Sequence, residues 1–302
     1  MNAQDSENNF SLVPQPPRDL EVPRTARNRI MSEMIESSLA VARDSAPAKI
    51  DLDALVCEGK RLYRGVGMTE EDIQAFGLFL RAAMGGHSEA QYLVSRCYHW
   101  EHGAQLDEAQ ALDWLRKSAE AGFSEAQYWL GNAYSYGDGV LQDDGEAFKW
   151  YSKAAEQGNA DAQRNLGLCY QCGDGVPNDE AKAAKWYRKA AEQGDPDAQC
   201  TLGYCYSVGQ GVPLDDVESV KWYCKAAEQG DGMAQSSLGY CYSEGTGVSV
   251  DILQAYKWFR LAADQGQTTE DAAGMAALMS PSEFQAAQRL YNEFKDSHAA
   301  KH

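Results

Sequence analysis

Residues 162–194 read AQRNLGLCYQCGDGVPNDEAKAAKWYRKAAEQG, and the pattern of this segment recurs along most of the 302-residue chain. Outward from it in both directions, the opening Ala-Gln pair returns every 36 residues without an insertion. The alanines of these pairs are Ala90, Ala126, Ala162, Ala198 and Ala234. A sixth, degenerate unit begins at Ala54 in the same register. So many equivalent residues do not recur at a constant spacing by chance, so the sequence predicts an array of six structural repeats.

Each unit predicts a first helix, a turn and a second helix. In the unit that begins at Ala126, apolar residues follow at helical spacing and give the first helix one apolar face. The glycines of the GDGV segment 137–140 end this helix, because glycine adopts the left-handed cap conformation without steric cost. Asp143 is the expected N-cap of the second helix, with Glu146 in the capping-box position. The same N-cap place is held by Asp107, Asp179, Asp215 and Asp251.

The second helix carries an apolar stripe that includes a recurring tryptophan. The tryptophans are Trp114, Trp150, Trp186, Trp222 and Trp258. We expect stacked units to bury them, since one helical hairpin cannot cover its own apolar stripe. Neighbouring hairpins must therefore pack on one another as a solenoid.

These residues resemble the Sel-1-like repeat, a member of the tetratricopeptide-like α/α solenoid superfamily. The matching signature is AQxxLGxxYxxGxGVxxDxxxAxxWYxxAAEQG. The unit at Ala90 departs from this signature at residues 99–103, which read HWEHG. The resemblance implies an all-α, right-handed solenoid of about six 36-residue helix–turn–helix repeats with terminal capping helices. It also implies a scaffold or adaptor that contacts other proteins, with no shared reaction.

The flanks of the repeats differ in composition from the repeats themselves. Residues 1–27 hold four prolines and few apolar residues, which is typical of a disordered tail. Residues 28–50 predict a helix and a linker, either as an N-terminal cap or as a regulatory or dimerising helix. The repeats then occupy 51–268, and 269–302 predicts a C-terminal capping helix that starts at Ser280 and Pro281.

The charge balance restricts the partners. Lys plus Arg total 27 and Asp plus Glu total 45, so the net charge is −18. Nucleic acid and anionic membrane surfaces require clustered cations, so we expect neither as a partner. The chain holds no apolar run of about 20 residues and no basic-then-apolar start. We therefore expect a cytoplasmic protein without membrane insertion.

Cysteines also follow the repeat. Four of the eight precede a tyrosine at equivalent places, which indicates small buried residues rather than disulfide partners. These four are Cys97, Cys169, Cys205 and Cys241. A metal site remains an alternative where Cys97 lies near His99, Glu101 and His102, but the fourth ligand is unspecified, and we expect no metal and no cofactor.

No known catalytic or nucleotide-binding motif is present in the sequence. Ser-x-x-Lys, Gly-x-Ser-x-Gly, Walker and dinucleotide-binding patterns are all absent, so we expect no enzyme activity. The predicted function is a protein–protein interaction scaffold. Two alternatives stay open: an acidic inhibitor or immunity protein against a basic toxin, and an exported host-interaction factor. The sequence specifies neither the partner nor the oligomeric state.

The expected binding face lies on the first helices, which line the concave surface in solenoids that this chain resembles. Offsets two, six and nine from the anchor alanine point away from the apolar face, and offsets three and ten flank them. Aromatic residues and arginine dominate binding at many interfaces, so their concentration at these offsets predicts a partner-binding groove. An alternative is that some of them pack against the adjacent unit. The candidate residues are Tyr92, Arg96, His99, Trp100, Tyr128, Trp129, Asn132, Tyr136, Tyr204 and Tyr240.

Overall fold

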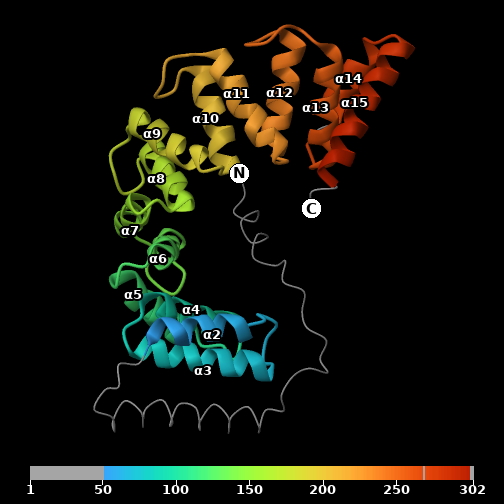
Figure 1. Ribbon diagram of the computed structural model, residues 1–302. Helices are drawn as coiled ribbons and strands as arrows, with labels where there is room; N and C mark the ends of the chain where they lie inside the picture. The colour runs from blue at the N-terminus through green and yellow to red at the C-terminus, as the bar shows by residue number, and fades with distance from the viewer. Residues whose placement is uncertain (1–50, 268, 300–302) are drawn as a thin grey trace, which may run out of the picture. The chain divides into compact units, whose positions relative to one another are not determined.

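The computed structural model describes residues 51–267 and 269–299, and all fourteen elements in these ranges are α-helices (Figure 1). The predicted all-α class is therefore confirmed. The predicted tail at 1–27 and the predicted helix and linker at 28–50 lie outside the described residues. No described helix combines the length and the apolarity that crossing a bilayer requires.

The described chain divides into two units, up to Trp150 and from Tyr151 onward, within helix α7 (Asp144–Glu156). In the first unit, consecutive helices pack in pairs around a core that contains Phe76, Phe79 and Val94. Its helices are α2 (Leu52–Leu62), α3 (Glu70–Met84), α4 (Ser88–Trp100), α5 (Glu108–Glu120) and α6 (Ser124–Tyr136).

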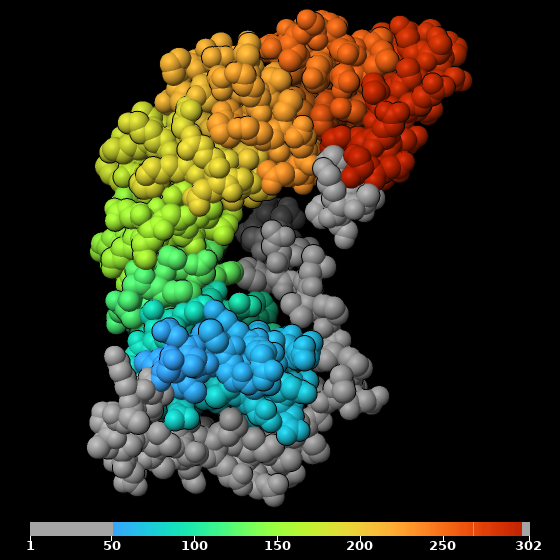
Figure 2. All heavy atoms as spheres, in the orientation of Figure 1, coloured from blue at the N-terminus to red at the C-terminus, as the bar shows by residue number. Residues whose placement is uncertain are grey.

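The second unit repeats the same pairing. Figure 2 shows the atoms of α10 to α12, coloured yellow to orange, meeting without gaps on the visible face. Its first four helices are α8 (Ala160–Cys172), α9 (Glu180–Glu192), α10 (Pro196–Val208) and α11 (Asp216–Glu228). The remainder are α12 (Gly232–Glu244), α13 (Ile252–Asp264), α14 (Glu270–Ala277) and α15 (Pro281–Ala299).

The final helix closes the apolar end of the repeats. α15 begins after Ser280, whose backbone N–H donates to the Glu283 carboxylate at 2.8 Å, as a capping box requires. The Phe294 ring packs edge-on against Trp258 of α13, with centroids 5.2 Å apart. The sequence predicts this capping helix but does not predict the short helix α14 that precedes it.

The second helices start at the predicted aspartates, but half of the predicted capping box is wrong. The Asp143 carboxylate accepts the Glu146 N–H at 3.0 Å, and the other four aspartates cap their helices in the same way. The Glu146 carboxylate, however, binds Lys149. The Asp143 N–H instead donates to the Tyr134 carbonyl at the preceding helix end, 3.0 Å away. This tertiary bond supplies the partner that the box would have supplied.

The Ala-Gln pair joins each repeat to the repeat before it. The Gln163 side chain is buried, and its Nε2 donates to the Ala155 carbonyl at 3.1 Å. The same bond, from glutamine to the carbonyl eight residues earlier, occurs at Gln91, Gln127, Gln199 and Gln235. The last carbonyls of a helix have no partner within it, so this glutamine satisfies one of them.

The glycine at offset five accepts an aromatic ring from the second helix. A Cβ on Gly167 would lie 2.8 Å from the Tyr187 ring, and one on Gly203 would lie 2.7 Å from the Tyr223 ring. Gly239 and Phe259 repeat this contact. The close packing of the two helices therefore depends on the missing side chain.

The prediction that the tryptophans are buried is wrong for part of the set. Trp222 and Trp258 are buried, whereas Trp186 is half-buried. In that repeat the following residue, Tyr187, fills the core, so Trp186 lies at the edge of the stripe. The Lys189 ammonium, 3.6 Å from its ring centroid, covers the exposed face.

The interpretation of the recurring cysteines as small buried residues is confirmed for Cys97, Cys169 and Cys205, while Cys241 is half-buried. All eight cysteines lie in the described ranges, and none forms a disulfide there. Burial raises the pKa of the Cys97 thiol to about 12, which keeps it protonated and unreactive.

Candidate functional site

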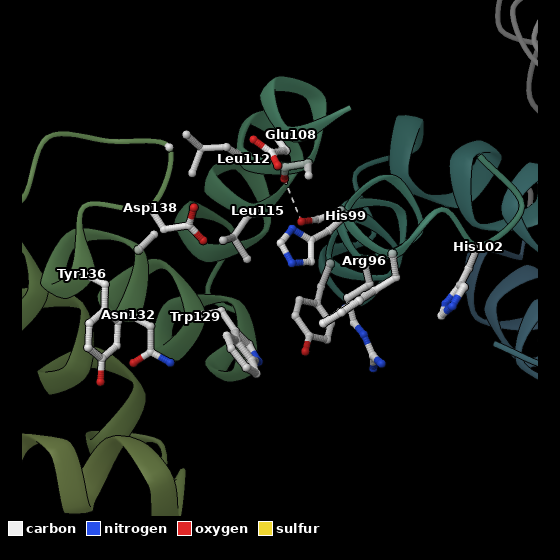
Figure 3. A pocket seen from close by; sticks show the side chains of 16 residues that line it. Arg96, His99, His102, Glu108, Leu112, Leu115, Trp129, Asn132, Tyr136 and Asp138 are labelled. Atoms are coloured by element: carbon white, nitrogen blue, oxygen red, sulfur yellow. Dashed lines mark hydrogen bonds between the residues drawn. The ribbon is translucent and has the colours of Figure 1, made fainter. Parts of the chain in front are cut away.

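A cavity of about 680 Å³ lies within the first unit, between α4, α5 and α6 (Figure 3). Helix α4 contributes Tyr92, Ser95, Arg96, His99 and Trp100, and His102 follows it. Helix α5 contributes Glu108, Ala111, Leu112 and Leu115. Helix α6 contributes Trp129, Asn132, Ala133 and Tyr136, and the turn after it adds Asp138 and Gly139. We call this cavity the α4–α6 pocket.

The first helix of the repeat aims three side chains at the α4–α6 pocket. Tyr92, Arg96 and His99 are four and three residues apart, so they share one face of α4. Ser95, beside them, donates its hydroxyl hydrogen to the Ala111 carbonyl at 2.7 Å and ties α4 to α5. The wall that carries these side chains is therefore fixed to its neighbour.

The pocket lies where the repeat departs from its own template. At offset 25 from the anchor alanine the other five repeats carry an aromatic residue, whereas the repeat that begins at Ala90 carries Leu115. At offset five, Ser95 stands in place of glycine. Ala133 lines the same space, where the following repeats have cysteine. The aromatic residues at offset 25 are Phe79, Tyr151, Tyr187, Tyr223 and Phe259.

The polar groups of the pocket are separated by sign. Figure 3 shows Glu108 and Asp138 on one side of Leu115 and the Arg96 guanidinium on the other. The Arg96 guanidinium carbon lies 5.9 Å from the centroid of the Tyr92 ring, a cation–π contact. Among the described residues, no carboxylate forms an ion pair with Arg96. The pocket therefore presents an exposed cation that forms no ion pair with a described carboxylate, in a strongly acidic chain.

Burial governs the ionisation of Tyr92. Loss of solvent raises the pKa of its phenol, and the neighbouring Arg96 charge opposes that shift. The ring of Tyr92 also packs against Phe123, with centroids 5.3 Å apart. Tyr92 is therefore neutral at physiological pH, and its ring, packed against Phe123, forms part of the pocket wall.

His102 lies at one end of the pocket and is held by a second tyrosine. Its Nδ1 is 2.6 Å from the Tyr63 hydroxyl. Burial lowers its pKa, with Asp72 opposing and Arg96 reinforcing this shift. Cys97, by contrast, is buried in the core, so it does not join the histidines as a ligand. In the described ranges no three His, Cys, Asp or Glu side chains gather as a metal ion would require.

The structure brings seven of the ten predicted binding residues together around the α4–α6 pocket. They are Tyr92, Arg96, His99, Trp100, Trp129, Asn132 and Tyr136. Tyr128 lies on α6 outside the lining, with its ring 5.3 Å from that of Trp129. Tyr204 and Tyr240 belong to the second unit, about half exposed, and the Tyr240 hydroxyl donates to Asp271 at 3.1 Å.

Sequence reasoning missed the floor of the pocket, because it followed only the outward residues of the first helices. Leu112 and Leu115 come from α5, a second helix. The signal that could have found them is the break in the aromatic register at Leu115. A missing ring at one position of a regular array indicates unfilled space.

Comparison with known proteins identifies the repeat. A family model described as Sel1 repeat matches residues 59–87, 88–123, 124–159, 160–195, 196–231 and 232–267. A comparison with curated proteins finds no match.

Solved structures with the same fold include two at 34% identity. One is a protective antigen present in uropathogenic Escherichia coli strains, with a TM-score of 0.69 over 87% of this chain. This chain spans 56% of that protein's length. The other is a Sel1 repeat protein from Oxalobacter formigenes, with a TM-score of 0.64 over 70% of this chain and 83% of its own. An immunity protein from Pseudomonas aeruginosa, 20% identical over 72% of this chain and 83% of its own with a TM-score of 0.40, is too distant to carry a functional argument.

Proposed function

Because the chain belongs to the Sel1 repeat family, we propose that it is a protein-interaction scaffold or adaptor whose α4–α6 pocket binds a partner protein or peptide. The observation that supports this proposal best is the gathering of four tyrosine and tryptophan side chains and an exposed arginine around one cavity. Tyr, Trp and Arg are the residue types that most often dominate binding energy at interfaces.

The pocket suits binding better than catalysis. Its one serine, Ser95, already donates its hydroxyl hydrogen to a backbone carbonyl, so that hydrogen is committed to structure. The remaining lining combines aromatic faces with a few polar groups, as recognition sites do. We therefore assign the pocket a binding role without a reaction.

The cytosol is the location we propose. Recurring cysteines in equivalent places of separate repeats, three of them buried thiols, suit a reducing compartment. Fractionation of native cells tests this, and recovery of the protein outside the cytosolic fraction would contradict it.

The partner-binding proposal is tested with variants that leave the packing intact. Arg96 and His99 are exposed and Tyr136 is 72% exposed, so the triple variant Arg96→Ala, His99→Ala, Tyr136→Ala should fold normally. Affinity purification from native cells with this variant should lose the partners that the wild-type protein recovers. Tyr92 and Trp129 are half-buried, so alanine there would also disturb the core.

A control variant removes the same number of exposed side chains elsewhere. Leu214, Val217 and Met233 are all more than half exposed and lie in the second unit. Their triple alanine variant should recover the same partners as the wild type. Equal recovery by the pocket variant and the wild type would reject the α4–α6 pocket as the binding site.

A further inference from the structure

We propose that the α4–α6 pocket receives an aromatic side chain, best a tyrosine, from a partner polypeptide, in the place that an internal tyrosine fills in other repeats. This inference rests on the proposed binding function and names the chemistry of the partner. It starts from a comparison of the repeats with one another, since each shows what normally occupies the equivalent space.

The repeat of α8 and α9 shows the filled state. The ring of Tyr187 lies against Gly167 and packs with Leu202 and Cys205 of the next helix, and its side chain is buried. Its hydroxyl donates to Gln171 Oε1 at 2.6 Å. Gln171 stands at offset nine of its repeat. The tyrosine thus inserts between two first helices and ends on the polar residue at offset nine.

A second filled repeat shows the same arrangement. The Tyr223 ring lies against Gly203, and Ser207, again the residue at offset nine, and Ser237 both oppose the rise that burial causes in the pKa of its phenol. The filled state is therefore a feature of the repeat and not of one pair of residues.

In the repeat of α4 and α5 the ring is missing while its surroundings remain. Leu115 takes the place of the tyrosine and Ser95 that of the glycine, and both line the cavity. The offset-nine position carries His99, whose imidazole also lines the cavity. An imidazole nitrogen is a hydrogen-bond acceptor for a phenol, as the Gln171 oxygen is for Tyr187. A phenol from outside therefore finds both the space and the polar terminus that the internal one would use.

The walls favour an aromatic occupant over an aliphatic one. Tyr92, Trp100 and Trp129 line the pocket, and aromatic pairs gain from edge-to-face and offset contacts beyond the area that they bury. The cavity of about 680 Å³ also exceeds one ring, which leaves room for the backbone that carries it. A peptide segment, rather than a free ring, suits this volume.

Charge complementarity identifies the residue next to the ring. Arg96 is exposed at the pocket and has no ion pair with a described carboxylate. A carboxylate beside the aromatic residue of the partner would pair with it in charge-assisted hydrogen bonds. The net charge of −18 repels strongly acidic segments at long range, so one acidic neighbour, rather than a run of them, fits the site.

The experiment measures two probes by NMR on isotope-labelled full-length protein. The first is p-cresol, the side chain of tyrosine alone, for which we expect a dissociation constant on the order of 1 mM. The second is a blocked hexapeptide with Tyr-Glu at its centre, compared with versions that carry Ala-Glu and Tyr-Lys. Binding should shift amide signals of α4 to α6, and the Tyr-Glu peptide should bind at least tenfold more tightly than the Ala-Glu peptide.

The decisive variant restores the internal ring. Ser95→Gly with Leu115→Tyr recreates the pair found at Gly167 and Tyr187, and it should reduce the affinity for both probes at least tenfold. Ser95→Gly with Leu115→Phe, the pair found at Gly239 and Phe259, provides a second filled pocket if the tyrosine variant folds poorly. Leu278→Tyr, at a position 67% exposed in the second unit, is the matched control and should bind like the wild type.

Arg96→Ala separates the carboxylate from the ring. It should weaken the Tyr-Glu peptide about threefold to tenfold and leave p-cresol binding unchanged. Equal binding of p-cresol by the wild type and both filled variants, or equal affinity for the Tyr-Glu and Ala-Glu peptides, would overturn the inference. If a filled variant still recovers the cellular partners that the exposed triple variant loses, the scaffold function stands and the aromatic anchor is rejected.

Discussion

Single residues that break the repeat carry structural information, and Glu101 is one of them. Each later first helix of the array ends at a glycine with a positive φ, such as Gly137 at 73°. Helix α4 ends instead at Glu101, with a φ of 55°, the only non-glycine residue with positive φ in the described ranges. The Glu101 Cβ is crowded in this left-handed conformation, and the fold tolerates the cost. The site of this strain adjoins the pocket residues Trp100 and His102.

Replacement of Glu101 by glycine should therefore stabilise the protein. We expect a gain of about 1 kcal/mol in the free energy of unfolding, because removal of the Cβ relieves the left-handed strain. Urea denaturation followed by circular dichroism measures this gain. Gly137→Ala is the reciprocal control and should lose a similar amount. A Glu101→Gly protein no more stable than the wild type would show that the residue is unstrained.

The sequence predicted residues on the walls of the pocket but not the cavity itself. Tyr92, Arg96 and His99 were found because helical periodicity separates inward from outward positions. Leu115 was missed because it looks like an ordinary core residue until the register is compared between repeats. Trp186 was misplaced because an apolar stripe roughly 100° wide contains both a tryptophan and the following tyrosine. Periodicity alone does not say which of the two lies at its centre.

At the scale of helices, the sequence correctly predicts where helices begin and end, but it does not identify the partners that side chains find on other helices. The aspartate N-caps and the glycine stops follow from backbone chemistry within a few residues, so one sequence suffices to find them. The Ala-Gln pair was recognised as an anchor without a reason for its glutamine. That reason is a bond to a carbonyl of the preceding helix, as from Gln199 to Ala191 at 3.0 Å. Only the folded arrangement shows this contact.

The glutamine bond predicts a cost for its removal. Gln199→Leu keeps the volume of the side chain but leaves the Ala191 carbonyl without its partner, and it also removes the acceptor of the Gln229 side chain, 2.8 Å away. We expect a loss of about 2 kcal/mol in the free energy of unfolding, the scale of an unsatisfied buried polar group. Thermal and urea denaturation measure it.

The control for this prediction is a glutamine on the surface. Gln288 is exposed within α15, so Gln288→Leu should change the stability by less than about 0.5 kcal/mol. Equal effects of the two substitutions would show that the buried bond contributes little.

At the scale of the whole molecule, the array is held by contacts between neighbours in sequence. In the second unit, α9 packs against α8 and α10, α11 against α10 and α12, and α13 against α12 and the two terminal helices. This pattern was predictable, because a 36-residue period forces each hairpin to cover its stripe with the next. The position of the cavity was not, since it depends on a few substitutions such as Leu115 and Ser95 that depart from the repeat pattern. A solenoid of this kind should respond locally to a local defect.

Gly203→Val tests this locality, because a Cβ at Gly203 would lie 2.7 Å from the Tyr223 ring and force α10 and α11 apart. We expect a loss of roughly 3 kcal/mol, the upper range for overpacking in a core. Hydrogen exchange followed by mass spectrometry should show amides of α10 and α11 exchanging about 100-fold faster, with a smaller effect in α9 and α12. Helices α4 and α5, in the other unit, should keep their wild-type exchange rates, because a repeat in such an array contacts only its neighbours. Gly203→Ala, with a smaller intrusion, should give the same pattern at lower amplitude. Uniform acceleration in every helix would instead show that the repeats unfold as one cooperative block.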